Sequence, residues 1–118
     1  MESAEYICKA MDIAEYVITR RADFSRPVTD FHLQKMLYFL QLGFSNASAG
    51  NCLIFQESFQ AQRYGPVIPC VYDRFFVYGE GPINRSFECS ELNKILSSRP
   101  NMKRFIDNAI DLLRKKSP

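Results

Sequence analysis

The sequence predicts a mainly α fold: a compact single domain of four to five helices, with a short β-hairpin or extended element between the second and fourth helices. The length of 118 residues corresponds to one domain, which we place at residues 1–118. Hydrophobic residues make up 47% of the chain and charged residues 24%, which is typical of a globular protein with one core. In several segments the apolar residues recur every three or four positions, and this spacing indicates amphipathic helices.

The first helix is expected over about Ala4 to Thr19, with Ser3 in a position to cap its N-terminus. Its apolar face is formed by Ile7, Met11, Ala14 and Ile18. The polar stretch from Arg20 to Val28 contains Pro27, so we expect it to connect the first helix to the second.

The second helix is expected to begin after Thr29, whose hydroxyl can cap it. Asp30 would lie in its first turn, where a carboxylate interacts favourably with the helix dipole. An apolar stripe at helical spacing predicts the buried face, and it consists of Leu33, Met36, Leu37, Leu40 and Phe44. Beside it runs a mixed stripe of Gln34, Tyr38 and Gln41, which is polar enough to face water and aromatic enough to face a partner.

The middle of the chain predicts a loop at residues 46–51, followed by short strands or extended chain at 53–55 and 57–61. Pro69 is suited to the first position of a third helix, which would stop at Gly79. The apolar residues of this helix are Val71, Tyr72, Phe75 and Phe76.

The C-terminal third predicts a short strand at Ile83–Phe87 and a brief helix capped by Ser90 that runs through Leu96. The last helix is expected to start at residues 98–100. Its apolar face consists of Met102, Phe105, Ile106, Ala109, Leu112 and Leu113.

The charge of the chain is mild. A net charge of +2 and a pI near 8.4 disfavour nucleic acid as the partner, because a pI above about 9 is the usual signal. The basic clusters Arg20-Arg21 and Arg114-Lys115-Lys116 are better explained as helix C-termini. No stretch reaches the roughly 18 consecutive apolar residues of a membrane helix, and the acidic N-terminus lacks the features of a secretory signal. We therefore expect a cytoplasmic protein without a membrane partner.

Groups that could carry catalysis or hold a metal are sparse. The four cysteines are widely spaced and are expected to be reduced, mostly buried thiols: Cys8, Cys52, Cys70 and Cys89. His32, the one histidine, should be solvated or bonded locally in the first turn of a helix. Asp107 and Asp111 share a helix face that we expect to be solvated. The sequence thus predicts no catalytic residues, no metal site and no cofactor.

The segment Arg63–Pro69 is the most structured-looking loop of the chain. Gly65, Pro66 and Pro69 would make it rigid, and rigidity lowers the entropic cost of presenting Arg63 and Tyr64 to a partner. Arginine and tyrosine often anchor interfaces. The alternative is that the loop only joins a strand to a helix, with Tyr64 packed in the core.

Three blocks of the sequence resemble the Panacea domain, an antitoxin module also described as a phage-associated or genetic-element-associated protein family. Leu33–Phe39 (LQKMLYF) resembles the family's LxKLLYF helix, and Phe59–Pro69 (FQAQRYGPVIP) resembles its FxAWxYGPVxP loop. The third block, from Val71-Tyr72 to Tyr78-Gly79, resembles the helix that ends in YG. With the first helix, the resemblance covers about residues 4–80. The chain has Gln62 and Leu42-Gly43 where the family tends to have Trp and Gly-Trp.

The resemblance implies a small helical protein that neutralises a cognate toxin by direct binding, or an adaptor that hands the toxin to a protease. Two other functions stay open: a nucleic-acid-binding module that would use Arg20, Arg21, Arg26 and the basic tail, and a structural protein of a phage or mobile element. Homo-oligomerisation is left open as well.

The residues that we expect to bind a protein partner belong to the first two of these blocks. They are Gln34, Lys35, Tyr38, Arg63 and Tyr64. Residues of the structural loops that would support them are Gly65, Pro66, Pro69 and Gly79. The competing explanation is that Tyr38 and Tyr64 bury their rings and tie the helix to the loop.

Overall fold

The computed structural model describes residues 5–47, 52–63 and 65–116. In chain order these ranges form β1 (Glu5–Cys8), α1 (Ala10–Asp23), α2 (Asp30–Ala47), β2 (Cys52–Phe55), β3 (Gln60–Gln62), β4 (Gly65–Val67), α3 (Pro69–Phe75), the 3-10 helix η1 (Phe76–Tyr78), α4 (Ser90–Ser97) and α5 (Pro100–Lys116). The predicted mainly α fold, with a hairpin between the second and fourth helices, is confirmed.

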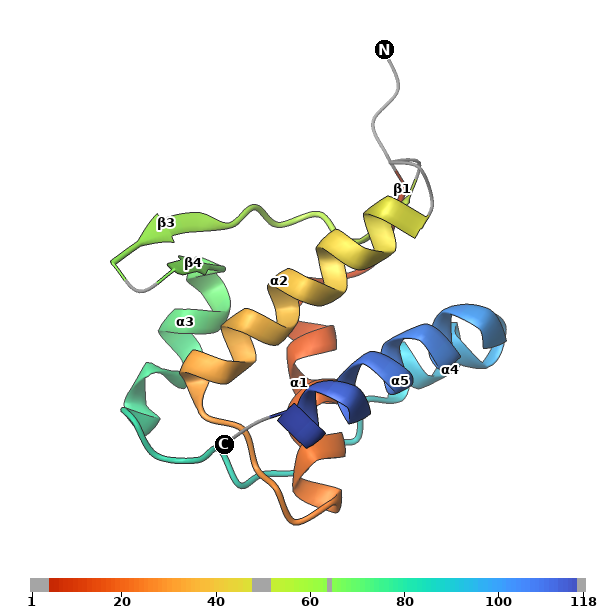
Figure 1. The fold of residues 1–118 in the computed structure, drawn as a ribbon. Helices are drawn as coiled ribbons and strands as arrows, with labels where there is room; N and C mark the ends of the chain where they lie inside the picture. The colour runs from red at the N-terminus through yellow and green to blue at the C-terminus, as the bar shows by residue number, and fades with distance from the viewer. Residues whose placement is uncertain (1–4, 48–51, 64, 117–118) are drawn as a thin grey trace.

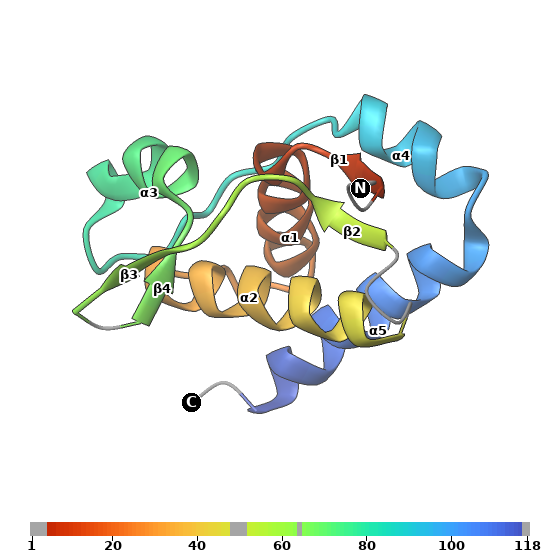
Figure 2. The same cartoon turned by 90° about the horizontal axis from the view of Figure 1, so that it is seen from above.

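The centre of the molecule is the crossing of α1 and α2, whose facing sides are buried (Figures 1 and 2). The β3–β4 hairpin and α3 lie at one end, and the β1–β2 pair lies toward the other end with α4 (Figure 2). The apolar stripe predicted on α2 faces this core, with its first four members buried and Phe44 packed against Phe105 of α5 at 5.9 Å between ring centroids. The largest fully buried side chains are Phe55, Phe75, Ile13, Ile18, Leu33, Leu37, Leu40, Ile54, Ile68, Ile83, Leu92 and Leu96.

The N-terminal segment differs from the sequence-based expectation. Residues 5–8 form the strand β1, and α1 starts only at Ala10 and continues to Asp23. β1 pairs in parallel with β2, so that Glu5 lies opposite Cys52 and Cys8 opposite Phe55. The predicted helix from Ala4 to Thr19 is confirmed from Ala10 onward but was wrong for residues 5–8, because this strand is held by hydrogen bonds to a distant segment. Ser3 lies outside the described residues.

The starts of α2 and α3 follow the sequence signals. The Thr29 hydroxyl accepts a hydrogen bond from the His32 amide at 3.2 Å, as expected of an N-cap. Pro69 occupies the first position of α3, where its missing N–H has no partner to lose. After η1 the chain turns at Gly79, which has a φ of 58°.

The segment after Gly79 forms one isolated antiparallel bridge, between Pro82 and Thr29, and no strand in the described residues. The strand expected at Ile83–Phe87 is absent there, and the Phe87 amide instead donates to the Thr19 hydroxyl at 2.8 Å. Ser90 is the first residue of α4 rather than its cap, a position held by Cys89. The last helix begins at Pro100 as expected, and Met102, Ile106 and Ile110 are its buried residues among those with described side chains.

A polar cluster joins α1 to α5. The Tyr16 hydroxyl donates to Asp107, and the Arg20 guanidinium donates to both carboxylate oxygens of Asp111 at 3.1 and 3.0 Å. The side chain of Asp107 is only 13% exposed and also pairs with Lys103 at 2.7 Å. The expectation that Asp107 and Asp111 form a solvated face was therefore wrong. Arg20 and Arg21 lie in the last turn of α1, as their position in the sequence predicted.

Candidate functional site

A pocket of about 380 Å³ lies between the N-terminal half of α2, the β3–β4 hairpin and the α3–η1 segment. Both of the first two motif blocks contribute to it, because α2 contains one and the hairpin contains the other. Its lining residues are Asp30, Phe31, Gln34, Lys35, Gln62, Arg63, Gly65, Pro66, Val67, Tyr72, Gly79 and Glu80. We refer to it as the α2–hairpin pocket.

The side chain of Gln34 connects two walls of this pocket, α2 and the segment between β4 and α3. Its side-chain oxygen accepts a hydrogen bond from the Ile68 amide at 2.9 Å, and its side-chain nitrogen donates to Asp30 at 3.3 Å. The residue is 3% exposed. The expectation that Gln34 faces water is therefore corrected: this amide positions β4 and the start of α3 against α2, while its edge contributes to the pocket wall.

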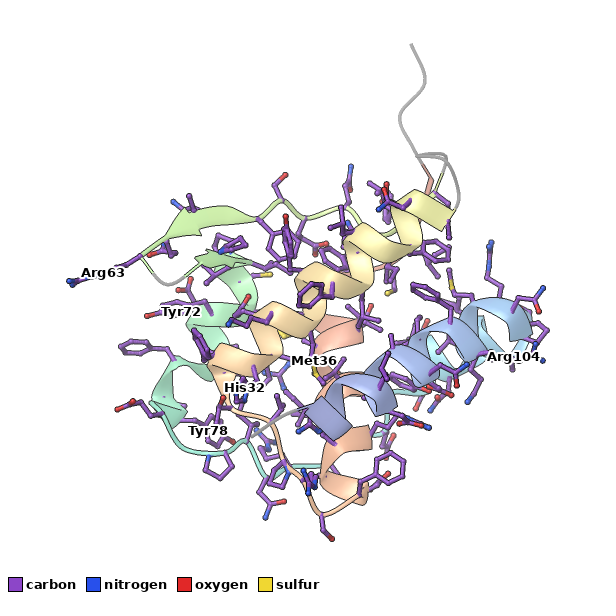
Figure 3. All side chains as sticks on the ribbon, in the orientation of Figure 1. His32, Met36, Arg63, Tyr72, Tyr78 and Arg104 are labelled. Atoms are coloured by element: carbon purple, nitrogen blue, oxygen red, sulfur yellow. The ribbon has the colours of Figure 1, made fainter. Side chains whose placement is uncertain are left out.

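The hairpin brings Arg63 to the same pocket. Gln60 pairs with Val67 and Gln62 with Gly65, which leaves Arg63 in the turn. Gly65 has a φ of 123°, a conformation that residues with side chains rarely adopt. Arg63 is exposed and points outward from the tip of the hairpin (Figure 3).

Tyr64, the other site residue expected in this turn, lies outside the described residues. Its expected role as a partner contact, or as a core residue, stays a prediction.

Asp30 is the buried charged group of the pocket. The residue is 7% exposed, and its carboxylate accepts one hydrogen bond, from Gln34. No second donor to this carboxylate lies within the described part of the chain. Burial raises the pKa of Asp30, and the hydrogen bond from Gln34 lowers it by a smaller amount, so the net shift is upward.

The outer part of the pocket combines aromatic rings with exposed charges. The Lys35 ammonium lies 4.5 Å from the centroid of the Phe31 ring, which is a cation–π distance. Tyr72 of α3 also lines the pocket, and its ring packs against that of Phe76 at 5.5 Å between centroids. Lys35, Arg63 and Glu80 are exposed, so solvent reaches these charges more easily than it reaches Asp30.

Tyr38 lies outside the pocket lining, one turn farther along α2 than Lys35. It is 39% exposed, and its ring meets that of Phe59 edge-on at 5.3 Å between centroids. Tyr38 therefore packs against the chain that leads into the hairpin while part of its surface faces solvent. Together with the exposed Phe39 and Leu42, it continues the apolar outer face of α2 beyond the pocket.

His32 and the four cysteines are not among the residues that line the pocket. Within residues 5–47, 52–63 and 65–116, no three His, Cys, Asp or Glu side chains come together as metal ligands. Burial, followed by Arg21 and Lys35, lowers the pKa of His32. No disulfide joins the four cysteines, all of which lie in the described ranges. Cys8 is buried, Cys52 and Cys89 are partly buried and Cys70 is exposed, so the expectation of mostly buried thiols was wrong.

Two of the arginines that a nucleic-acid surface would need are engaged inside the molecule. Arg20 is bound to Asp111, and Arg21 is 3% exposed with its Nε donating to the Arg26 carbonyl at 2.9 Å. The side chains at residues 114–116 lie outside the described part. None of the helices in the described ranges has the length and apolar character to cross a membrane.

The sequence indicated Gln34, Lys35 and Arg63 as partner-binding residues, and all three line the pocket, but Asp30, Phe31 and Tyr72 were not among the expected binding residues. Asp30 was expected only to interact with the dipole of the second helix, and Tyr72 was expected to be one of the apolar residues of the third helix. Asp30 and Phe31 could have been suspected because they lie just before the LQKMLYF block. The contact between α2 and α3 has no signal in the sequence and is seen only in the structure.

Comparisons of the chain with models of protein families, with curated proteins and with solved structures found no match.

Proposed function

We propose that this chain is a protein-binding module that resembles a Panacea antitoxin and neutralises a cognate toxin by direct binding. The observation that carries the proposal is that Lys35, from the helical motif block, and Arg63, from the loop block, line one pocket. These blocks are separated along the chain by β2, and they are the segments on which the resemblance depends. A surface built from both would explain why they occur together.

The side chains around the pocket have the composition of a protein interface. Large apolar residues are exposed at Phe31, Tyr72 and Phe76, the last of them at 62%. Aromatic residues and arginine are enriched among the residues that dominate binding energy. The outer face of α2 adds Tyr38 and Phe39, so the apolar surface continues along the helix. These features support a macromolecular partner over a small-molecule substrate, and a cytoplasmic toxin is the partner that we propose.

The adaptor function that the resemblance also implies would use the same surface for the toxin and another surface for a protease. The internal engagement of Arg20 and Arg21 favours a protein partner over nucleic acid. We therefore keep nucleic-acid binding and a structural role in a phage or mobile element as outcomes of the experiment.

The proposal is tested by co-expression with the product of the neighbouring gene, scored for growth and for co-purification. We expect this chain to rescue growth and to co-purify with the toxic product. Arg63→Ala should weaken binding by about 2 kcal/mol or more if Arg63 is an anchor. Arg104→Ala is the matched control, because Arg104 is exposed on α5 at the opposite end of the molecule (Figure 3).

Three results would count against the proposal. A neighbouring product that is not toxic and does not co-purify would remove the antitoxin function. Equal binding by the Arg63→Ala and Arg104→Ala variants would show that the α2–hairpin pocket is not the binding surface. Retention of nucleic acid by the purified chain, with affinity that falls steeply with salt, would favour the nucleic-acid alternative.

A further inference from the structure

Asp30 is an incompletely paired carboxylate in the wall of an open pocket. It is 7% exposed, and Gln34 is its one hydrogen-bond donor among the described residues. A carboxylate has two oxygens and about four acceptor positions. Burying a carboxylate with few hydrogen-bond donors is unfavourable. A ligand that donates hydrogen bonds to Asp30 in this pocket would therefore be stabilised.

The charge that a ligand of this pocket would carry follows from the positions of the charged side chains. Asp30 is buried, whereas Lys35 and Arg63, the basic residues of the lining, are exposed at the outer part of the pocket. Glu80, a second carboxylate of the lining, is exposed and has no ion pair in the described part of the chain. The interior of the pocket therefore complements a cation, and the outer charges can contact polar groups around it.

The shape and composition of the pocket narrow the choice of cation. Phe31 and Tyr72 place aromatic rings in the lining, and a volume of about 380 Å³ accommodates a long side chain. A guanidinium group can donate two hydrogen bonds to a carboxylate and can also stack on aromatic rings, which a lysine ammonium does less well. Few other side chains combine these properties.

We infer that the α2–hairpin pocket receives an arginine side chain of the partner protein, whose guanidinium pairs with Asp30. This inference rests on the proposed role of the surface in protein binding and adds the chemical class of the anchor that the surface takes. Asp30 would be a binding residue, and Gln34 would hold it in place through the 3.3 Å hydrogen bond. The partner would then present an exposed arginine in a segment able to reach between the hairpin and α2.

The inference is tested on the isolated chain, without the partner, by NMR titration of the ¹⁵N-labelled protein. The probes are N-acetyl-arginine methylamide and its neutral counterpart N-acetyl-citrulline methylamide, which has nearly the same shape. We expect saturable shifts at the amides of Phe31, Lys35 and Gly65 with the arginine probe, with a dissociation constant in the millimolar range. The citrulline probe should bind at least tenfold more weakly, because it lacks the charge.

Asp30→Asn should remove this preference, since the variant keeps the shape and the oxygen that accepts from Gln34 but loses the charge. Asp73→Asn, an exposed position on α3 outside the pocket, is the matched control and should bind the arginine probe as the parent chain does. With the toxic partner, Asp30→Asn should weaken binding at least tenfold.

The inference is overturned if the citrulline probe binds as well as the arginine probe, if neither gives saturable shifts at these amides, or if Asp30→Asn keeps the preference. Stronger binding of N-acetyl-glutamate methylamide would show that the outer lysine and arginine make the pocket an anion site. These outcomes are distinct from failure of the proposed function. Partner binding without arginine recognition removes this inference alone, whereas arginine recognition without a toxic partner leaves the pocket chemistry and removes the antitoxin function.

Discussion

The side chain of Gln34 on α2 is bonded to the backbone of Ile68, the residue that immediately precedes α3, at 2.9 Å. Ile68 is fully buried, so without Gln34 its N–H would have no water to replace the lost acceptor. One glutamine thereby ties the hairpin and α3 to the central helix.

Replacing Gln34 with leucine should lower the free energy of unfolding by about 1–3 kcal/mol, because the substitution leaves the buried N–H of Ile68 unpaired. Urea unfolding followed by circular dichroism measures this change. The control is Gln62→Leu, which alters an exposed glutamine of the hairpin and should change stability by about 0.5 kcal/mol or less. Equal effects of the two substitutions would show that the bond to Ile68 contributes little.

Asp30→Asn should not destabilise the protein at neutral pH. Burial raises the pKa of Asp30 in the folded chain above its ordinary value of 3.8, so the folded state holds the proton more tightly than the unfolded state. The contribution of Asp30 to stability is thus greatest below that ordinary value and decreases as the pH rises through the folded value. Thermal unfolding should give the variant an equal or higher Tm at pH 7, with the difference shrinking toward about pH 4. A clearly lower Tm at pH 7 would mean that Asp30 serves mainly the helix dipole.

Removing the carboxylate of Asp107 should loosen α5 from α1. Asp107→Ala leaves the Tyr16 hydroxyl, in a residue that is 8% exposed, without its acceptor and deprives Lys103 of its ion pair. We expect a loss of about 1–3 kcal/mol in the free energy of unfolding. Asp73→Ala, at an exposed position, should stay within about 0.5 kcal/mol of the parent chain. Similar losses in both would contradict a role for the α1–α5 cluster.

Substitutions at Gly65 test whether the hairpin needs the backbone conformation of a glycine or only the absence of a side chain. Apart from the two neighbouring residues, a β-carbon at this position would meet no atom within 4 Å, so we expect a loss on Gly65→Ala to come from the φ of 123° rather than from crowding. Gly65→Ala and Gly65→Val should each destabilise by about 1–3 kcal/mol. Gln62→Ala, at the residue paired with Gly65, should have little effect. Unchanged melting temperatures in the two Gly65 variants would show that the hairpin tolerates a side chain.

The four thiols should react in an order set by their surroundings. Cys70 is exposed and should be labelled first in the native protein. Cys8 is buried, its thiol donates to the Ile54 carbonyl at 3.6 Å, and burial raises its pKa to about 12. Cys8 should therefore react only after β1 separates from β2 or the protein unfolds. Mass spectrometry of native and denatured samples should find four labels after denaturation, and early labelling of Cys8 would contradict the burial of β1.

The parts of the fold that could be predicted from the sequence are those whose signals are local. The hydroxyl of Thr29 and the ring of Pro69 act within one turn of their own helices, so the starts of α2 and α3 were predicted correctly. β1 could not be predicted because its partner, β2, lies beyond two helices in the chain. The segment Ile83–Phe87 was mistaken for a strand because it is apolar at both ends, although Phe87 is held by a side chain, that of Thr19.

In the candidate site, too, features with local sequence signals could be predicted and features that depend on distant segments could not. Lys35 and Arg63 were identified within motif blocks, and the structure brings both to one pocket. The burial of Gln34 could not be predicted, because a polar residue beside an apolar stripe faces water unless another segment offers it partners. That segment is the start of α3, whose position depends on the turn of the hairpin.

The parallel pairing of β1 with β2 has a consequence for how the chain is made. During synthesis β1 emerges before its strand partner, which follows only after all of α1 and α2. Until then the N-terminal segment has none of the inter-strand hydrogen bonds that define it as a strand. The helical pair can form from contacts nearer in sequence, and we expect β1 to join it late, because its pairing closes a long loop. We therefore expect the order in which the elements acquire structure to differ from their order along the chain.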